Sequence, residues 1–453
     1  MNKVTNYLKS HLVTISYFVF FVLALLPTMF TFFNKLGLFY KAGVLIIFIA
    51  FLVVYIVKKK IKLNYRLLSI PAVILVVYAL YYLAVLPTYF NYVTPEYSYI
   101  SGTHVIVTTT LSMRFNSIMT MFNLCFFASL FLIISPSLGL NRSDIVCYTA
   151  LIDSITLIAC VVSIKEINSN GYEIGGLISF LGNKNTFGQF LMTAIFASLL
   201  SSTFVDNKFI KAGFIGVSFI YFAFVFLSKS STAIVVSLLI IVFWFCLFII
   251  DSKILKKYMK VAIFTVFAVA LAVLLSSPYI PLLQGTKVAE VVKNLYDKIF
   301  AIKGKSFLKL FTDRGTFWAL GSYIVKPEYL MLGYGNSTLE EIVFRSVVNG
   351  YTTRELMNAY LSVFDGFGIL GSIIYLFILG YLFYKYFKCE EQMTEYLLVF
   401  FIAFLIYGMF ESLLLFESFS GSLLLSPIMA TPAVYLKVKK NKQLEEVVDN
   451  GQL

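Results

Sequence analysis

The stretch LVTISYFVFFVLALLPTMFTFF (residues 12–33) decides the fold of this chain. It contains no charged residue, and about 20 apolar residues in a helix can cross a hydrocarbon core of roughly 30 Å. A backbone inside a membrane must satisfy its own polar groups, so the stretch is predicted to be a helix. It is too long for a cleavable signal peptide and lacks a small-residue cleavage site, so we interpret it as the first membrane span.

Apolar stretches of similar length recur along nearly the whole chain. Hydrophobic residues make up 60% of the sequence and charged residues 13%, whereas a soluble domain carries about 25% charged residues. The composition therefore predicts an all-α, polytopic transmembrane helical bundle of about twelve spans. The predicted spans are 12–33, 37–57, 67–86, 115–135, 146–164, 187–204, 212–227, 233–250, 261–280, 361–384, 396–416 and 421–436.

The distribution of positive charge predicts the topology. With a cytoplasmic N-terminus, about 20 Lys and Arg fall in the inner segments and about 6 in the short outer loops, as the positive-inside rule requires. Both termini are then predicted to be cytoplasmic. The net charge of +13 is accounted for by these clusters, which favours membrane lipids over nucleic acid as the partner.

This topology divides the chain into four parts. They are spans one to nine in 1–280, an extracytoplasmic loop at 281–357, the last three spans in 358–436 and a cytoplasmic tail at 437–453. A loop as long as the second part is usually functional.

The predicted loop carries its own helical signals. Apolar spacing predicts an amphipathic helix at 288–300, suited to lie on the outer headgroups. A second helix is predicted at 314–324, followed by a turn at 326–328 and a glycine-rich turn at 332–336. We therefore expect one large helical loop on the outer face.

Arginine is rare in this chain, which has six Arg among its 36 Lys and Arg. Four of the six are predicted on the outer face, namely Arg114, Arg314, Arg345 and Arg354. The guanidinium fork matches phosphate oxygens two at a time, which a lysine ammonium cannot do. The placement favours recognition of a lipid-linked phosphate or diphosphate. The alternative is a set of solubilising loop charges or headgroup anchors.

Two short segments place cations at predicted helix N-termini on the outer face. LGNKNTFG (residues 181–188) opens one span and SKSST (residues 228–232) opens another. A helix N-terminus favours anions through its free N–H groups and its dipole. Lys184, Asn185 and Lys229 are therefore candidate substrate-binding residues, although ordinary polar helix caps would look the same.

These segments also carry a family resemblance. GNKN (182–185), the serine-rich turn and RGTFW (314–318) resemble, in order and spacing, the O-antigen ligase and polymerase superfamily. LGYGN (332–336) continues the likeness. MNAYL (357–361) with GILG (368–371) matches the ligases' His-Asn, nine residues, Gly-x-x-Gly pattern, except that Met357 stands where the ligases have His.

The resemblance implies glycosyl transfer from an undecaprenyl-diphosphate-linked glycan at the bacterial cytoplasmic membrane, with no nucleotide sugar, cofactor or metal. It implies that Arg314 engages the donor diphosphate with help from Lys184, and that Asn358 belongs to the site. Because Met357 cannot accept a proton, a polymerase of repeat units is favoured over a ligase. A chain-length regulator remains open as a protein partner.

Three carboxylates are candidates to deprotonate an attacking hydroxyl. Glu355 and Asp365 flank the Met-Asn segment, and Glu411 lies within a predicted span, where a carboxylate is costly and often functional. The alternative for Glu355 and Asp365 is pairing with Arg354 or helix capping. Arg345 and Arg354 are further candidates to bind substrate. Asp153, in another span, is predicted to pair structurally.

Two other functions are weighed against the polymerase. A ligase would move finished glycan to another acceptor, and a flippase or other transporter would also have about twelve spans. A transporter is expected to hide ionisable residues at mid-membrane and to show paired halves, and the sequence shows few such residues and no half-repeat. The five cysteines form no disulfide framework or metal-ligand spacing.

Overall fold

The computed structural model describes residues 11–29, 37–63, 65–94, 96, 100, 102, 104–138, 140, 142–170, 177–181, 183–251, 313–324, 326–347, 356–388, 392–411, 423–425 and 427–428. The predicted span at 261–280, the amphipathic helix at 288–300 and the tail at 437–453 lie outside the described residues. Of the predicted span at 421–436, only 423–425 and 427–428 are described.

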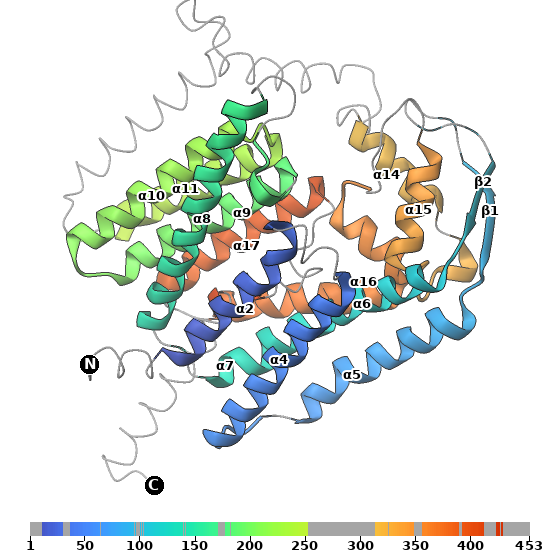
Figure 1. Cartoon of the computed structure of the whole chain (residues 1–453), viewed down its shortest axis with the longest axis horizontal. Helices are drawn as coiled ribbons and strands as arrows, with labels where there is room; N and C mark the ends of the chain where they lie inside the picture. The colour runs from blue at the N-terminus through green and yellow to red at the C-terminus, as the bar shows by residue number, and fades with distance from the viewer. Residues whose placement is uncertain are drawn as a thin grey trace, which may run out of the picture.

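The described part of the chain is predominantly helical (Figure 1). The long helices are α2 (Leu12–Met29), α4 (Gly37–Lys58), α5 (Tyr65–Leu80), α6 (Leu111–Ser129), α8 (Arg142–Asn170), α9 (Lys184–Phe204), α10 (Lys208–Leu227), α11 (Ser231–Asp251), α16 (Ala359–Lys388) and α17 (Gln392–Phe410). Each predicted span that falls in the described residues is helical, so this part of the secondary-structure prediction is confirmed.

Six helical segments in the described residues are long and apolar enough to cross a membrane. They are Leu68–Val85, Arg142–Ile164, Lys184–Phe204, Lys208–Leu227, Ser231–Ile249 and Ala359–Tyr384, and shorter apolar helices occur at Leu12–Pro27, Ala42–Lys58 and Glu395–Phe410. The fold is thus compatible with an all-α membrane protein.

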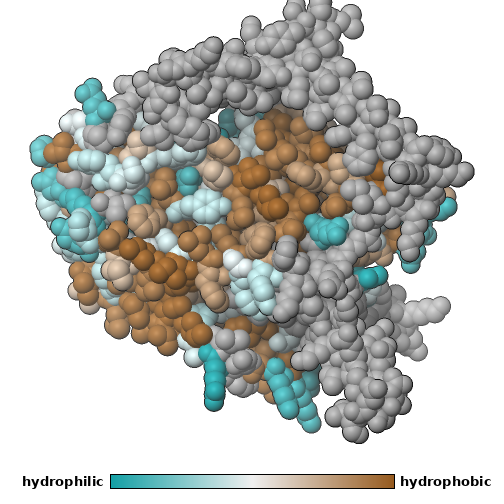
Figure 2. Space-filling model, turned by 180° about the vertical axis from the view of Figure 1, so that it is seen from behind, coloured by the Kyte–Doolittle hydropathy of each residue, from teal (hydrophilic) through white to brown (hydrophobic). Residues whose placement is uncertain are grey.

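The helical surfaces carry apolar side chains outward. Val57 of α4, Val73 of α5 and Phe377 of α16 are all exposed by more than half. Figure 2 shows hydrophobic colour across much of the described surface on one side of the molecule. Such an apolar exterior is unusual for a soluble monomer and suits a lipid environment.

Helix α9 lies among α8, α10, α11 and α17 (Figure 1). Every residue from Phe187 to Ser202 is buried. Polar pairs cross these packed faces. Asp153 accepts a hydrogen bond from Ser198 at 2.7 Å, and Ser201 contacts Thr149 at 2.8 Å. Asp153 thus has the structural pairing that the sequence predicts.

A close approach joins α9 to α11 near their N-terminal ends. A Cβ on Gly188 would lie 2.7 Å from the Cβ of Ala233. Only a glycine leaves room for this approach, which brings the starts of the two helices side by side.

A β-hairpin, absent from the prediction, connects the α5 segment to α6. β1 (Tyr89–Val93) pairs antiparallel with β2 (His104–Thr108). Burial alternates along β2, with Val105 and Val107 inside. The β-branched residues at alternate positions suit a half-buried strand. This two-stranded pairing is an addition to the predicted all-α fold in the described part of the chain.

The C-terminal end of the α5 segment is held by Arg114. After α5 the chain forms a π-helical turn, Tyr81–Val85. The guanidinium of Arg114, from α6, donates to the carbonyl oxygens of Tyr82 at 3.1 Å and Leu86 at 2.7 Å. Arg114 is buried, so its described contacts give it a capping role at a helix end.

The described part of the predicted loop contains two helices, α14 (Asp313–Ile324) and α15 (Asn336–Ser346), with a 3₁₀ turn at Pro327–Tyr329 between them. The helix predicted at 314–324 and the turn that follows it are confirmed, whereas α15 was not predicted. The Tyr334 hydroxyl donates to the Ile324 carbonyl at the end of α14 at 2.7 Å, and burial raises the pKa of this phenol.

The glycine-rich turn pairs with a break in α16. The Tyr334 and Gly335 N–H groups donate to the carbonyls of Asp365 and Gly366 at 3.0 and 2.8 Å. The Gly333 carbonyl accepts from the Tyr81 hydroxyl at 3.1 Å. Gly368 has φ 67° and ψ −166°, and a Cβ there would lie 2.5 Å from the Met331 carbonyl. The two glycine motifs thus meet backbone to backbone, as only glycines allow.

Candidate functional site

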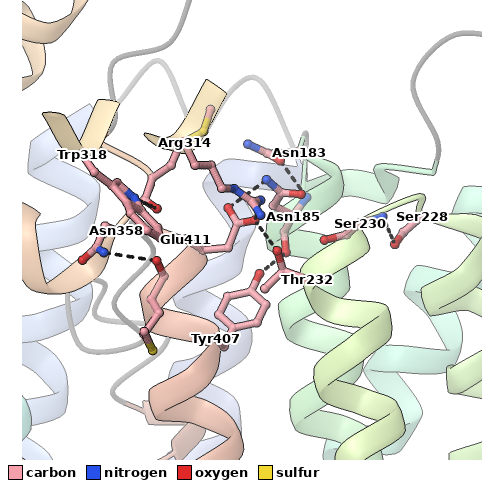
Figure 3. A network of polar contacts seen from close by, with 12 residues as sticks. Asn183, Asn185, Ser228, Ser230, Thr232, Arg314, Trp318, Asn358, Tyr407 and Glu411 are labelled. Carbon is pink, nitrogen blue, oxygen red and sulfur yellow. Dashed lines mark hydrogen bonds and ion pairs between the residues drawn. The ribbon is translucent and has the colours of Figure 1, made fainter. Parts of the chain in front are cut away.

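Four segments that are distant in the sequence meet around the carboxylate of Glu411 (Figure 3). Its Oε1 accepts hydrogen bonds from Arg314 Nη2 at 2.7 Å and from Thr232 Oγ1 at 3.1 Å. Its Oε2 accepts from Asn185 Nδ2 at 3.0 Å. We call these four residues the Glu411 network. Glu411 directly follows α17, which ends at Phe410, and is only 2% exposed.

Arg314 is positioned by the first turn of α14. Its guanidinium carbon lies 5.8 Å from the centroid of the Phe410 ring, a cation–π distance. One turn further on, Trp318 packs against the same ring and donates its indole N–H to the Met357 carbonyl at 3.2 Å. The Arg314 side chain keeps 27% exposure while that of Glu411 keeps 3%, so the arginine is the member that faces outward.

The start of α9 explains the residue order in GNKN. Asn183 is the N-cap, and its side-chain oxygen accepts from the Asn185 N–H at 2.8 Å. The Asn185 side chain is then directed to Glu411. The backbone carbonyl of Asn185 accepts a hydrogen bond from the Tyr407 hydroxyl of α17 at 3.1 Å. Lys184, between the two asparagines, is exposed.

The N-terminal end of α11 and the turn before it place the Ser230 and Thr232 hydroxyls at the site. Lys229 has φ 56°, and the turn is closed by the Ser230 N–H, which donates to Ser228 Oγ at 3.3 Å. This turn aims Thr232 at Glu411. The Ser230 hydroxyl is buried, has no hydrogen-bond partner among the described residues, and points toward the side of Asn185 and Thr232 (Figure 3).

The start of α16 is fixed by Asn358. Its side-chain oxygen accepts from the Leu361 N–H at 3.0 Å, and its amide donates to the Met409 carbonyl at 3.2 Å. Asn358 therefore caps α16 and ties it to the end of α17. Met357 adopts φ 52° and contributes its backbone carbonyl to Trp318.

The N-terminal ends of α9, α11, α14 and α16 thus gather near one carboxylate. Each end carries N–H groups that have no partner within the helix and the positive pole of the helix dipole. Arg314 adds a full positive charge that is partly open to the outside. The arrangement can bind an anion and can stabilise negative charge that develops on a departing group.

Two predicted site residues lie away from this network in the described structure. Arg345 of α15 pairs with Glu341 at 2.7 Å and donates to the Ile106 carbonyl of β2 at 3.0 Å, so its contacts hold the hairpin. Asp365 lies at the break in α16, only 2% exposed, with no partner for either carboxylate oxygen among the described residues. Arg354 and Glu355 lie outside the described residues.

Sequence reasoning missed Thr232, Trp318 and Tyr407 as members or supports of the site. Thr232 and Trp318 stand in the motifs SKSST and RGTFW, so the motifs contained a signal for them. Tyr407 lies one helical turn before Glu411. In a predicted apolar helix, residues four positions apart lie on the same face, so this spacing from the carboxylate could have identified Tyr407.

The fold and site together define a helical protein, compatible with a membrane, that has a polar site where four helices begin. Among the described residues, no group of three or more His, Cys, Asp or Glu is arranged to hold a metal ion. The sequence matches no family model and no curated protein at a significant level.

Proposed function

We propose that this protein is a polymerase that joins undecaprenyl-diphosphate-linked oligosaccharide repeat units on the outer face of the bacterial cytoplasmic membrane. One observation carries the proposal. Three segments that resemble the O-antigen ligase and polymerase superfamily, GNKN, SKSST and RGTFW, meet at Glu411 although they are far apart in the sequence. The fourth, MN, contacts Trp318 of RGTFW and Met409 beside them.

The chemistry fits the charges of the site. Arg314 binds the diphosphate of the donor, and the sugar–oxygen bond breaks with its electron pair leaving on that diphosphate. Positioning of the acceptor hydroxyl and stabilisation of the leaving phosphate supply most of the catalysis such a reaction needs. Glu411 is the carboxylate that contacts Arg314, and we assign it the proton of the attacking hydroxyl.

The membrane arrangement is part of the proposal: about twelve spans, cytoplasmic termini and an extracytoplasmic loop at 281–357. Contacts between the predicted outer segments support it. The β-hairpin region meets the predicted loop through the Ile100–Val347 bridge and the Arg345–Ile106 hydrogen bond. The starts of α9 and α11, also predicted outside, lie beside Arg314.

Met357 supports a polymerase over a ligase. A thioether cannot take the proton that a histidine would take at this position. The backbone carbonyl of Met357 accepts a hydrogen bond from the Trp318 indole. Proton transfer at this site therefore has to use another group, and the proposal gives it to Glu411.

The test uses purified protein in lipid nanodiscs with a lipid-linked repeat unit and no nucleotide sugar. The wild type is expected to build a ladder of polymer lengths. Arg314→Lys keeps the charge but loses the bidentate fork, and it is expected to slow extension roughly 100-fold. Arg66→Lys changes an exposed arginine at the start of α5, on the predicted inner face, and serves as the matched control.

Unchanged extension by Arg314→Lys would contradict the role of this residue. A repeat unit that is moved across the membrane but never extended would favour the flippase over the polymerase.

A further inference from the structure

The carboxylate of Glu411 is surrounded by hydrogen-bond donors in the way that a bound anion would be. Donors from three different helices of the described structure, α9, α11 and α14, reach its two carboxylate oxygens. Converging donors at helix N-termini, together with a guanidinium, are the groups that bind phosphoryl oxygens in proteins. The occupant of this donor set is a side chain of the protein itself.

We propose that Arg314, Asn185 and Thr232 form the phosphoryl-binding pocket of the site and that Glu411 is its resident occupant, which the ligand displaces. A phosphoryl group then takes over the three donors that the carboxylate now holds. This inference deepens the proposed function and rests on it for the naming of a phosphoryl ligand.

Exposure shows which partner an incoming ligand meets first. The Arg314 side chain is 27% exposed and that of Glu411 3%, so the guanidinium is the reachable member of the pair. Among the described residues, Glu411 provides the only acceptor for this guanidinium. The other N–H groups of Arg314 can therefore contact a ligand while the Arg314–Glu411 ion pair is still intact. A change of side-chain rotamer at Glu411 then frees the donors for the ligand.

A spare donor lies at the edge of the pocket. The Ser230 hydroxyl is 1% exposed, and it lacks a hydrogen-bond partner among the described residues. It points toward Asn185 and Thr232 (Figure 3). A buried polar group without a partner destabilises the folded protein, and a phosphoryl group, which has more oxygens than a carboxylate, would supply its acceptor. The pocket thus fits a larger oxyanion than the one it holds.

The resident carboxylate also has a physical reason to be there. Arginine and the positive poles of several helices would otherwise face one another in a buried space without a counter-charge, which is costly. Glu411 balances this charge until a ligand arrives. The ligand must then outcompete a carboxylate, which favours multiply charged phosphoryl groups over singly charged anions.

The experiment measures binding of inorganic diphosphate and of geranyl diphosphate, separately, by titration calorimetry on the full-length protein in nanodiscs. Glu411→Gln removes the competing charge and is expected to tighten binding about tenfold, equal to ~1.4 kcal/mol. Glu411→Asp keeps the charge but shortens the side chain, so its carboxylate no longer reaches all three donors and binding tightens several-fold. Arg314→Gln is expected to lose binding in each background.

Glu341→Gln is the matched control, because Glu341 also pairs with an arginine at 2.7 Å, on α15 and away from the Glu411 network. It is expected to leave diphosphate binding unchanged. Thermal unfolding of every variant confirms folding, and Glu411→Asp decides the matter if Glu411→Gln does not fold. Tighter binding of geranyl diphosphate alone identifies the lipid-linked headgroup as the ligand, and tighter binding of both compounds identifies the diphosphate alone.

Equal or weaker binding in both Glu411 variants would overturn the inference and make Glu411 an orienting partner of Arg314. Absence of binding by every variant would overturn it as well. The proposed function fails separately: tighter binding by the Glu411 variants together with no polymer from the wild type rejects the polymerase and keeps the pocket.

Discussion

The residues around the site have two kinds of role. Some cap the N-terminal ends of helices, and others contact one another across the site. Asn183 and Asn358 cap α9 and α16. The Asn185 side chain reaches Glu411, and the Met357 backbone carbonyl accepts from Trp318. Gly188 acts differently, because its missing side chain lets α9 approach α11. The distance between Asn185 and Thr232, and hence their shared hold on Glu411, depends on that approach.

Gly188→Ala is expected to lower both the thermal unfolding midpoint and the rate of polymer extension. The new methyl group would lie 2.7 Å from Ala233, and overpacking of this kind costs ~1–3 kcal/mol. Gly216→Ala is the control, since a Cβ at that position in α10 meets nothing within 4 Å. The double variant Gly188→Ala with Ala233→Gly should recover the wild-type midpoint, and its failure to do so would place the cause elsewhere.

The sequence predicted the site residues unevenly, for reasons that lie in the side chains. Arg314 and Asn185 were found because rare arginines and polar helix starts stand out in an apolar sequence. Arg114 and Arg345 stand out equally, yet they hold backbone carbonyls. Sequence alone does not separate an arginine that caps a helix from one that faces a site, because both are isolated charges in predicted outer segments.

At the scale of elements, the break in α16 joins the glycine-rich turn to the α5 segment. The Ile369 N–H binds the Leu330 carbonyl at 2.8 Å, and the hydroxyls of Tyr78 and Tyr82 bind the carbonyls of Phe367 and Gly366. Carbonyls freed by the break thus find donors on the glycine-rich turn and on the α5 segment. A broken helix is tolerated in a membrane protein where its freed groups are satisfied in this way.

Gly368→Ala is expected to abolish the folded protein, as judged by yield and by a monodisperse elution peak in detergent. Its φ of 67° with ψ of −166° belongs to a region that is essentially restricted to glycine, and the Cβ would clash with the Met331 backbone at 2.5 Å. Gly380→Ala, in the same helix with open space around it, should fold normally and gain slightly in stability. A well-folded Gly368→Ala protein would show that the break is dispensable.

Helices and strands were predicted well where the length of an apolar run determines them. They were predicted poorly where tertiary contacts determine them. The long helices follow from apolar runs of membrane length. The β-hairpin and α15 depend on packing against each other, through Ile100 with Val347 and Arg345 with Ile106. Such tertiary pairing leaves no periodic signal strong enough to read from the sequence.

At the scale of the whole molecule, the topology makes opposite predictions for two exposed lysines. Lys62 follows α4 on the predicted inner face, and Lys184 opens α9 on the predicted outer face. In a cysteine-free background, a membrane-impermeant maleimide added to intact spheroplasts should label Lys184→Cys and leave Lys62→Cys unlabelled until the membrane is opened. The reverse pattern would invert the proposed orientation and move the Glu411 network to the cytoplasmic side.

The hydroxyl of Tyr78 and the carbonyl of Phe367 are 289 positions apart in the chain, and Asn185 and Glu411 are 226 apart. Early helices therefore enter the membrane long before the ribosome has made the groups that complete them. During synthesis, Arg314 exists without its carboxylate and Tyr78 without its acceptor. A nascent chain released after residue 314 and before residue 367 would carry both orphaned groups, which would give membrane quality control a local chemical mark of incomplete synthesis.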